Sequence, residues 1–169
     1  MDQERRKEEI IERLRAAGRP VSASALAGNF GVSRQIIVGD IAVLRAKGHE
    51  IMATPRGYLL ADETGMPAYQ VACRHKADQI LDELNAIVDC GGCVVDVIVE
   101  HPLYGELVGK LEISNRLEAA DFAGRVTESG ATPLSLLTGG VHLHTIRCRD
   151  SKTLKQIRAR LRGLDLLFE

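Results

Sequence analysis

The sequence predicts an α+β protein of two domains: a winged helix-turn-helix over residues 1–62, and over residues 66–169 a domain whose helices pack on a mostly antiparallel sheet. Three observations support this prediction. The first fifty or so residues have the 3.6-residue apolar period of helices and are divided by glycines. After residue 68, strand-like and helix-like runs alternate over about 100 residues. Between these parts, Gly65-Met66-Pro67 is typical of a linker.

Three helices are expected in the N-terminal part. Ser22 and Ser33 are residues of the type that caps helix N-termini, and each stands just before an apolar helical pattern. In the third pattern Ile37, Ile41 and Leu44 recur at helical spacing, which predicts a buried stripe that packs on the first two helices. The expected helices span residues 4–17, 23–29 and 34–47.

The opposite face of the third helix is expected to contact DNA. A short helix, a glycine turn and a helix with a free first turn form the helix-turn-helix arrangement, whose second helix enters the major groove. Arg34 and Gln35 can each make bidentate contacts to base edges, and Val38 is suited to meet a thymine methyl. The candidate DNA-contacting residues of this helix are Ser33, Arg34, Gln35 and Val38. A three-helix packing module that contacts no nucleic acid is the alternative.

Two short strand-like runs follow the third helix and predict a wing. They cover residues 49–53 and 58–61, on either side of Thr54-Pro55-Arg56-Gly57. Arg56 would lie at the tip, where its guanidinium reaches a phosphate or the minor groove. Residues 1–60 carry 10 Lys and Arg against 7 Asp and Glu, whereas the remainder carries 12 against 16. This asymmetry places any nucleic-acid contact in the N-terminal part.

The C-terminal part is expected to have the element order β-α-β-β-α-β-β-α. His75-Lys76 leads into its first helix, and Ser114 is expected to cap the second, with Leu117, Ala120, Ala123 and Val126 on the packed side. Asp150 or Ser151 begins the last helix. The predicted strands span residues 69–74, 93–100, 104–113, 134–138 and 141–148.

Composition excludes some classes of protein and leaves the cysteines a structural role. No apolar run approaches the ~20 residues that cross a bilayer, and the charged N-terminus lacks a signal-peptide core. A cytoplasmic protein without a membrane partner is therefore expected. Cys90-Gly-Gly-Cys93 has the CxxC spacing of zinc and redox sites, but there is no second CxxC. A glycine turn flanked by two small thiols is the favoured interpretation.

Two histidines, His142 and His144, lie two residues apart in the last predicted strand, so their side chains share one face. Imidazoles at this spacing suit a metal such as Zn, Ni or Fe, but polar residues on a solvated face give the same pattern. His75 and Glu83 would complete a set of three histidines and one carboxylate. Within one helix they would lie about 12 Å apart, so His75 must precede the helix and fold back. Spacing alone leaves both interpretations open.

The chain also resembles a known family of bacterial repressors. The stretch VSASALAGNFGVSRQIIVGDIAVLRAKGHEI resembles the winged-helix domain of the biotin-repressor and DeoR-like type. The IMATPRGYLL that follows resembles a narrower group, the niacin-responsive transcriptional repressors. Three stretches of the C-terminal part resemble the three-histidine (3H) domain of that group: ACRHKADQILDEL, VEHPLYGELVGKLEISNR and PLSLLTGGVHLHTI. The motifs cover nearly the whole chain, in order. Gly39, in the middle of the recognition helix, departs from the pattern and costs roughly 1 kcal/mol of helix propensity.

The resemblance implies a metal site, an effector and an operator. It implies one divalent transition metal per chain (Ni, Zn or Fe), nicotinic acid or a related pyridine carboxylate as co-repressor, and a homodimer on double-stranded DNA that represses genes of NAD synthesis or niacin uptake. His101, with Tyr104, would lie near the effector, although His101 is equally suited to fixing the bend at Pro102. The implied metal ligands are His75, Glu83, His142 and His144.

Two further expectations concern the metal site and what it does. Gly139 and Gly140, having no side chains, would leave room beside the metal for an effector. The alternatives to a co-repressor mechanism are a regulator for which the metal itself is the signal, and a metal-dependent hydrolase with His101 or Glu106 as acid or base. The sequence does not separate the metal-signal alternative from a co-repressor mechanism, whereas a hydrolase would leave the attached winged helix without a role.

Overall fold

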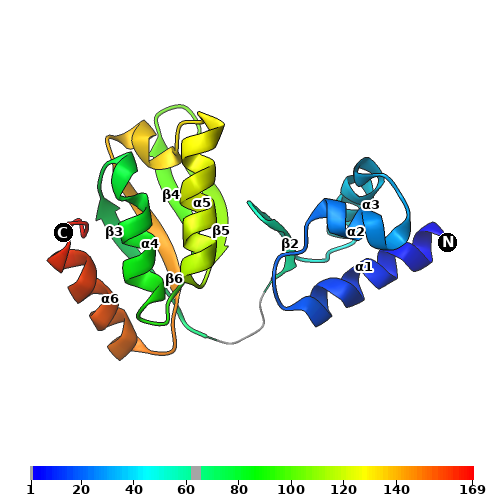
Figure 1. The fold of residues 1–169 in the computed structure, drawn as a ribbon, viewed down its shortest axis with the longest axis horizontal. Helices are drawn as coiled ribbons and strands as arrows, with labels where there is room; N and C mark the ends of the chain where they lie inside the picture. The colour runs from blue at the N-terminus through cyan, green and yellow to red at the C-terminus, as the bar shows by residue number, and fades with distance from the viewer. Residues whose placement is uncertain (1, 62–65) are drawn as a thin grey trace. The chain divides into compact units, whose positions relative to one another are not determined.

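The computed structural model describes residues 2–61 and 66–169, and the chain forms two compact units, Met1–Thr64 and Gly65–Glu169 (Figure 1). The predicted α+β class is confirmed. Residue 62, the expected end of the first domain, and Gly65, the first residue of the expected linker, lie outside the described residues. None of the described helices is long and apolar enough to cross a membrane.

The first unit has the three predicted helices followed by an antiparallel hairpin. Its serines cap the helices as predicted. The Ser22 hydroxyl accepts a hydrogen bond from the backbone N–H of Ala25 (3.0 Å), and the Ser33 hydroxyl accepts one from that of Ile36 (3.3 Å). The elements are α1 (Gln3–Ala17), α2 (Ala23–Phe30), α3 (Arg34–Ala46), β1 (Ile51–Thr54) and β2 (Gly57–Leu60).

An apolar core and a buried ion pair hold α3 against α1. Ile37, Ile41 and Leu44 of α3 are buried, as their spacing predicted. Arg6 of α1 donates to both carboxylate oxygens of Asp40, from Nε to Oδ2 (2.7 Å) and from Nη2 to Oδ1 (3.2 Å). This bidentate pair ties α1 to the buried side of α3 and leaves the opposite side of α3 exposed.

The hairpin is attached to the loop that precedes α2. Val21 exchanges two backbone hydrogen bonds of 2.8 Å with Tyr58. Gly57 is required at this junction, because its φ is +137° and a Cβ would lie 2.3 Å from the Val21 oxygen. At the turn the Thr54 hydroxyl accepts from the Arg56 N–H (3.2 Å). Arg56 therefore lies at the tip of a wing that is fixed to the helical core.

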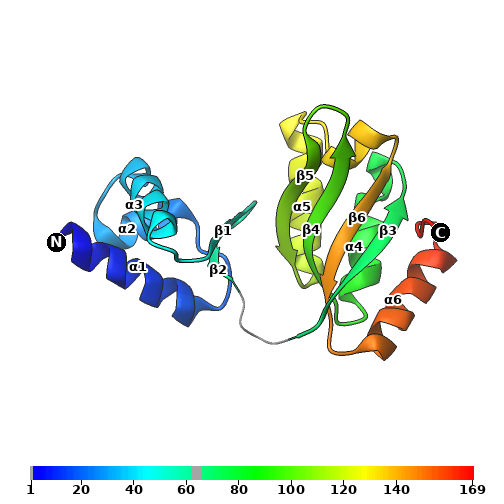
Figure 2. The same ribbon diagram turned by 180° about the vertical axis from the view of Figure 1, so that it is seen from behind.

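The second unit is a four-stranded antiparallel sheet with three α-helices, counted over residues 66–169, on one face (Figure 2). The strand order is β3-β6-β4-β5, so the last strand of the chain lies between β3 and β4. In Figure 2 the sheet is in front and α4 and α5 lie behind it. The elements are β3 (Ala68–Arg74), the 3₁₀ helix η1 (Ala77–Gln79), α4 (Ile80–Val88), β4 (Cys93–His101), β5 (Gly105–Ile113), α5 (Arg116–Ser129), the 3₁₀ helix η2 (Leu134–Thr138), β6 (Val141–Arg147) and α6 (Ser151–Gly163).

The insertion of β6 into the sheet positions the two neighbouring histidines. Alternation along β6 puts His142 and His144 on the face that the helices cover, and both are buried. Across the ladder, Cys73 of β3 is directly opposite His142. On the other side of β3, Cys73 forms a β-bridge with Leu167. The C-terminal end of β3 is therefore held between β6 and the C-terminal segment.

The prediction of a strand over residues 134–138 is wrong. This segment is η2, which follows Pro133 and is closed by a hydrogen bond from the Gly140 N–H to the Ser135 oxygen (2.9 Å). A short apolar run does not distinguish strand from helix by its period. Here the proline and the two glycines that bound the run favour a tight helical turn, because they fix φ or permit a positive φ.

Helix α5 begins one residue later than predicted, and the face that packs on the core differs from the predicted one. Its N-cap is Asn115, whose side-chain oxygen accepts from the Glu118 N–H (3.0 Å), rather than Ser114, which donates to the Glu118 carboxylate. Leu117 is 81% exposed. The residues that contact the core are Ala119, Phe122 and Val126. Val126 therefore packs as predicted and Leu117 does not. Alanines and glycines fit either face of this helix, so the sequence pattern leaves its rotation ambiguous.

The CxxC segment is the predicted glycine turn. Helix α4 ends at Val88 and β4 begins at Cys93, with Gly91 between them at a φ of +87°. The chain's cysteines, Cys73, Cys90, Cys93 and Cys148, are all free thiols. No structural zinc knuckle is formed by this pair among the described residues.

Candidate metal centre and DNA-contacting face

Three imidazoles surround one carboxylate in the core of the second unit. Glu83 Oε2 lies 2.7 Å from His75 Nε2 and 3.1 Å from His144 Nε2, and Glu83 Oε1 lies 2.9 Å from His142 Nε2. The ring of His142 stands edge-on to the rings of His75 and His144, with centroids 4.8 Å apart and planes at 83° in both pairs. All four residues are at most 7% exposed. The fold thus gathers side chains from a loop, a helix and a strand.

His75 reaches Glu83 because it precedes the helix. It follows the last residue of β3, and η1 separates it from α4, on which Glu83 lies in the first turn. The ring folds back, with Nδ1 donating to the Lys76 oxygen at 2.7 Å. The condition that the sequence imposed on this pair is therefore met. The N-terminal end of α4 also favours a negative charge at Glu83.

The other two imidazoles are oriented by backbone carbonyls in the same way. His142 Nδ1 donates to the Gly140 oxygen at 2.8 Å, and His144 Nδ1 donates to the Asp96 oxygen at 2.7 Å. Asp96 stands at a β-bulge in β4, where the register shifts between Val94 and Asp96. A bulge re-aims backbone groups, which here turns a carbonyl toward the ring of His144.

These hydrogen bonds fix the protonation of the rings. A carbonyl can only accept, so Nδ1 of each imidazole carries the proton, and in a neutral ring Nε2 then presents a lone pair. Three such lone pairs converge on the oxygens of Glu83, which are also acceptors. His144 Nε2 is buried and lies 3.1 Å from Glu83 Oε2, but this contact lacks the geometry of a hydrogen bond to any described residue. Acceptors that face acceptors in a buried site require protons or a cation between them.

The electrostatics of the metal-free cluster follow from the same contacts. Burial by itself would lower the pKa of His75 and of His144, but the Glu83 carboxylate outweighs it and raises both pKa values above that of an ordinary imidazole. Burial would likewise raise the pKa of Glu83, but the surrounding histidines hold it well below its usual range. Imidazolium–carboxylate pairing is thus how the cluster is satisfied when protons are available.

The two glycines before β6 have different roles from the one expected. Gly140 does not leave room: its φ is +93°, and a Cβ there would lie 2.5 Å from the carbonyl oxygen of His75. Its own carbonyl receives His142 Nδ1, and its backbone therefore packs between two of the histidines. Gly139 has a φ of +65° with nothing within 4 Å of a Cβ. The expectation of an open space beside Gly140 is wrong, because the chain there approaches His75 too closely.

The predicted base-contacting residues form an exposed surface on the first unit. Ser33, Arg34, Gln35 and Val38 are exposed on the first turns of α3, away from the core stripe. Gly39 is exposed beside them, with nothing within 4 Å of a Cβ. The residues are placed where a major-groove contact requires them, and the contact itself stays a prediction.

Residues 68–169 match the family model of the 3H domain, and residues 6–59 match that of an HTH domain. Over 160 residues the chain is 43% identical to "Probable transcription repressor NiaR" of Thermotoga maritima, which covers 95% of this chain and 91% of that protein. Over 155 residues it is 37% identical to "Transcription repressor NadR" of Bacillus subtilis, with coverages of 89% and 86%. The chain belongs to the 3H-domain family of transcription repressors. The family that the sequence motifs indicated is confirmed.

Inside the 3H domain the structure adds one residue that the sequence interpretation missed. The sulfur of Cys73 lies with an oxygen of Glu83 and a nitrogen of His142 in a group whose atoms are all within 4.8 Å of one another. Burial raises the pKa of the Cys73 thiol, and Glu83 raises it further. The signal in the sequence was Cys73-Arg74-His75, which puts the thiol on the same side as His75, but only the β3–β6 register reveals its proximity to His142.

The other polar residues proposed for the 3H domain are not brought to the cluster. His101 ends β4, and its Nδ1 accepts from the N–H groups of Leu103 (3.1 Å) and Tyr104 (3.4 Å). This is the bend-fixing role that the sequence left open for His101. Tyr104 stacks beside it and is 74% exposed at the hairpin tip. Their contact with an effector stays a prediction.

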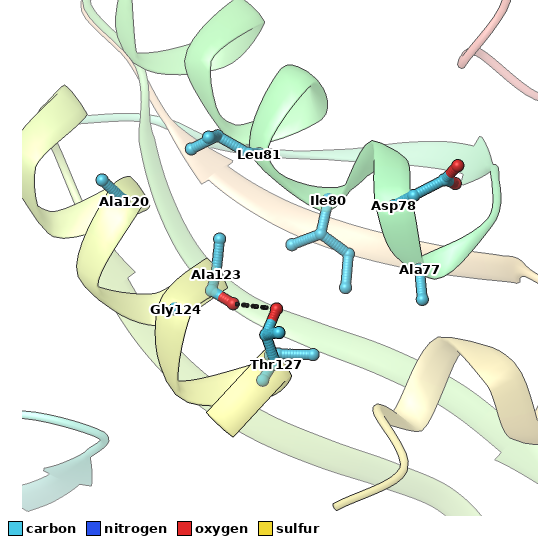
Figure 3. A pocket seen from close by; sticks show the side chains of 9 residues that line it. Ala77, Asp78, Ile80, Leu81, Ala120, Ala123, Gly124 and Thr127 are labelled. Atoms are coloured by element: carbon cyan, nitrogen blue, oxygen red, sulfur yellow. Dashed lines mark hydrogen bonds between the residues drawn. The ribbon is translucent and has the colours of Figure 1, made fainter. Parts of the chain in front are cut away.

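A separate groove of about 290 Å³ lies between the start of α4 and α5 (Figure 3). Its lining is mainly small and apolar, with Ile80 and Leu81 on one side and Ala123 and Thr127 on the other. The Thr127 hydroxyl is engaged with the Ala123 oxygen (3.2 Å). The groove's charged residue is Asp78, which would repel a carboxylate, so the groove does not match a pyridine carboxylate.

Proposed function

We propose that this chain is a transcription repressor whose 3H domain binds one divalent transition metal through His75, Glu83, His142 and His144, and whose operator binding is stimulated by nicotinic acid. Its relatives carry the name of transcription repressors, which favours a regulator over an enzyme. The exposed start of α3, with Arg34 and Gln35, would enter the major groove, and Arg56 would contact the backbone or the minor groove.

The convergence of three Nε2 lone pairs on one carboxylate carries the metal proposal. Every Nδ1 is committed to a backbone carbonyl, which leaves only Nε2 to face Glu83. Hydrogen bonds of this kind to the second ring nitrogen are how proteins orient metal-binding histidines. Three imidazoles and a carboxylate suit Zn, Ni or Fe. When bound, the metal would supply positive charge, and the protein's part is to hold the end of β3, α4 and β6 around it.

The proposed repressor acts as a homodimer on a double-stranded, palindromic operator in the cytoplasm. One winged helix makes few contacts, and a two-fold symmetric pair doubles them on two half-sites. Light scattering of the purified full-length protein gives the stoichiometry directly. A monomer that binds the operator tightly would contradict this part of the proposal.

Operator binding under three conditions tests the mechanism. A duplex would be selected from a random-sequence library by the purified protein in the presence of Ni²⁺ and nicotinate. Fluorescence anisotropy would then measure its affinity without metal, with Ni²⁺ alone, and with Ni²⁺ and nicotinate. Tightest binding in the third condition supports the proposal. Failure to select any sequence refutes the DNA-binding role.

Substitution of the β6 histidines links the metal to the response. His142→Ala and His144→Ala are expected to abolish stimulation by nicotinate while sparing basal DNA binding. His49→Ala is the matched control, because His49 is an exposed histidine of the first unit. Loss of the metal without loss of the nicotinate response would refute the link.

The burial of the cluster favours a second candidate, in which the metal itself is the signal. With its ligands at most 7% exposed, the site offers an effector no direct approach in this conformation. In that case Ni²⁺ alone would give the full increase in operator affinity and nicotinate would add nothing. The same burial argues against a hydrolase, whose substrate must reach the metal.

A further inference from the structure

The geometry points to Cys73 as a fifth metal ligand, so that the 3H domain of this chain holds its metal with three imidazoles, one carboxylate and one thiolate. The inference rests on the metal site proposed above and adds a ligand to it. It predicts a sulfur–metal bond, which has its own spectroscopic signature.

The Cys73 sulfur is within the span of one coordination sphere. It lies with a Glu83 oxygen and a His142 nitrogen in a group whose atoms are within 4.8 Å of one another. At about 2.3 Å for Zn–S and about 2.1 Å for Zn–N, two ligands on opposite sides of one metal are about 4.4 Å apart. Shifts of a few tenths of an ångström therefore bring sulfur and nitrogen to one metal.

The backbone holds the sulfur in this place. Cys73 is opposite His142 in the β3–β6 ladder and is bridged to Leu167 on its other side. It stands two residues before His75, so its side chain points to the helix-covered face, and it is 0% exposed. A side chain so fixed loses little further freedom when it binds a metal.

Charge balance explains what a thiolate contributes. Three neutral imidazoles and Glu83 would leave a net charge of +1 around a divalent metal. A Cys73 thiolate brings the net charge to zero, which matters because an uncompensated charge is costly in a fully buried site. On binding, the S–H bond breaks, the proton leaves to solvent, and the sulfur lone pair forms the bond to the metal without any change of oxidation state.

A second observation also indicates that the cluster is a binding site. His144 Nε2 is buried, faces the cluster and has no hydrogen-bond partner among the described residues. This nitrogen lies 3.1 Å from Glu83 Oε2, so its lone pair is available to a cation bound beside that carboxylate. With Cys73 on the neighbouring strand, soft and hard donors face the same point, which favours Zn²⁺, Co²⁺ or Ni²⁺ over Mg²⁺ or Ca²⁺.

Cobalt titration tests the inference. Metal-free, full-length protein is titrated anaerobically with Co²⁺ while near-ultraviolet absorption is recorded, and bound metal is counted by equilibrium dialysis. Wild type is expected to develop an intense sulfur-to-cobalt charge-transfer band that saturates at one equivalent. Cys73→Val and Cys73→Ser are expected to lose this band, and their Zn²⁺ affinity should fall by at least about 10-fold. Cys148→Val is the matched control, because Cys148 is equally buried and lies outside the cluster.

The outcomes separate this inference from the metal site itself. One equivalent of bound Co²⁺ without the band in wild type, or a band that persists in Cys73→Val, overturns the thiolate ligand and leaves the four-residue site standing. Absence of bound Co²⁺ in wild type overturns both. Should the Cys73 variants fail to fold by circular dichroism, X-ray absorption of the wild type decides, since a sulfur neighbour at about 2.3 Å is required.

Discussion

Substitution of Gly140 by alanine should weaken metal binding, although residue 140 is not one of the proposed ligands. The added Cβ would lie 2.5 Å from the carbonyl oxygen of His75, a contact that backbone atoms cannot absorb without moving. Lengthening this contact to even 3.0 Å requires the backbone at residue 140 or at His75 to move by about 0.5 Å, which is about the tolerance of a pre-organised site. Because Gly140 also accepts the Nδ1 proton of His142, the displacement disturbs two histidines at once.

The neighbouring glycine separates this effect from backbone strain. Gly139 also has a positive φ, of +65°, but a Cβ there meets nothing within 4 Å. Both Gly139→Ala and Gly140→Ala should therefore lose about 1–2 kcal/mol of folding stability from the left-handed conformation. Only Gly140→Ala should lose metal affinity, by about 10- to 100-fold, which corresponds to about 1.4–2.7 kcal/mol.

Chelator competition for Ni²⁺ measures the affinities, and thermal unfolding of the metal-free proteins measures the strain. The reasoning is refuted if Gly140→Ala binds Ni²⁺ as tightly as wild type. It is equally refuted if the two alanine variants lose the same amount of affinity, because strain alone would then account for the loss.

Three further predictions concern pH, DNA recognition and the first unit. In the metal-free protein the raised pKa of His75 contributes folding stability below the ordinary imidazole pKa of about 6.5, and this contribution is lost as pH rises through the raised value. The lowered pKa of Glu83 contributes folding stability above the ordinary carboxyl pKa of about 4.3, and this contribution is lost as pH falls. Metal-free protein should thus melt at its highest temperature between these limits, and added Ni²⁺ should stabilise most above them; a pH-independent increment would contradict this. Arg34→Ala should weaken operator binding by about 1–3 kcal/mol and relax base preference at one position, as read by anisotropy on single-base variants, whereas unchanged binding would displace the recognition face. Asp40→Ala should cost about 3 kcal/mol in urea unfolding, because it leaves the Arg6 guanidinium buried without its partner; a loss below about 1 kcal/mol would show that the pair contributes little.

Local sequence signals predicted most of the first unit correctly. The serine caps, the glycine stops and the stripe of Ile37, Ile41 and Leu44 act within a few residues of one another, so they specify helices without reference to distant parts of the chain. In the second unit the same kind of reasoning failed at residues 134–138 and on the rotation of α5. Short apolar or alanine-rich runs are compatible with more than one arrangement, and long-range packing chooses between them.

The metal cluster shows where local signals end. The i, i+2 spacing of His142 and His144 determined that they share a face. For His75, the sequence showed only that it must precede the helix to reach Glu83, and the structure shows that it does. Only the tertiary structure decided that β6 lies between β3 and β4, and this single choice of strand order brings both histidines to His75 and Cys73. It likewise decided that Gly140 is a close backbone contact and not an open space.

The sequence by itself determined the residue types, their local faces and, through its motifs, the family. What only the tertiary structure decided is the meeting of Cys73 and the histidines around Glu83, with His142 nearest the thiol, and the carbonyls that leave each Nε2 facing inward. The physical reason is that periodicity encodes the direction of a side chain relative to its own element. Distances between elements are set by strand pairing and by helix packing over separations of about sixty residues and more along the chain.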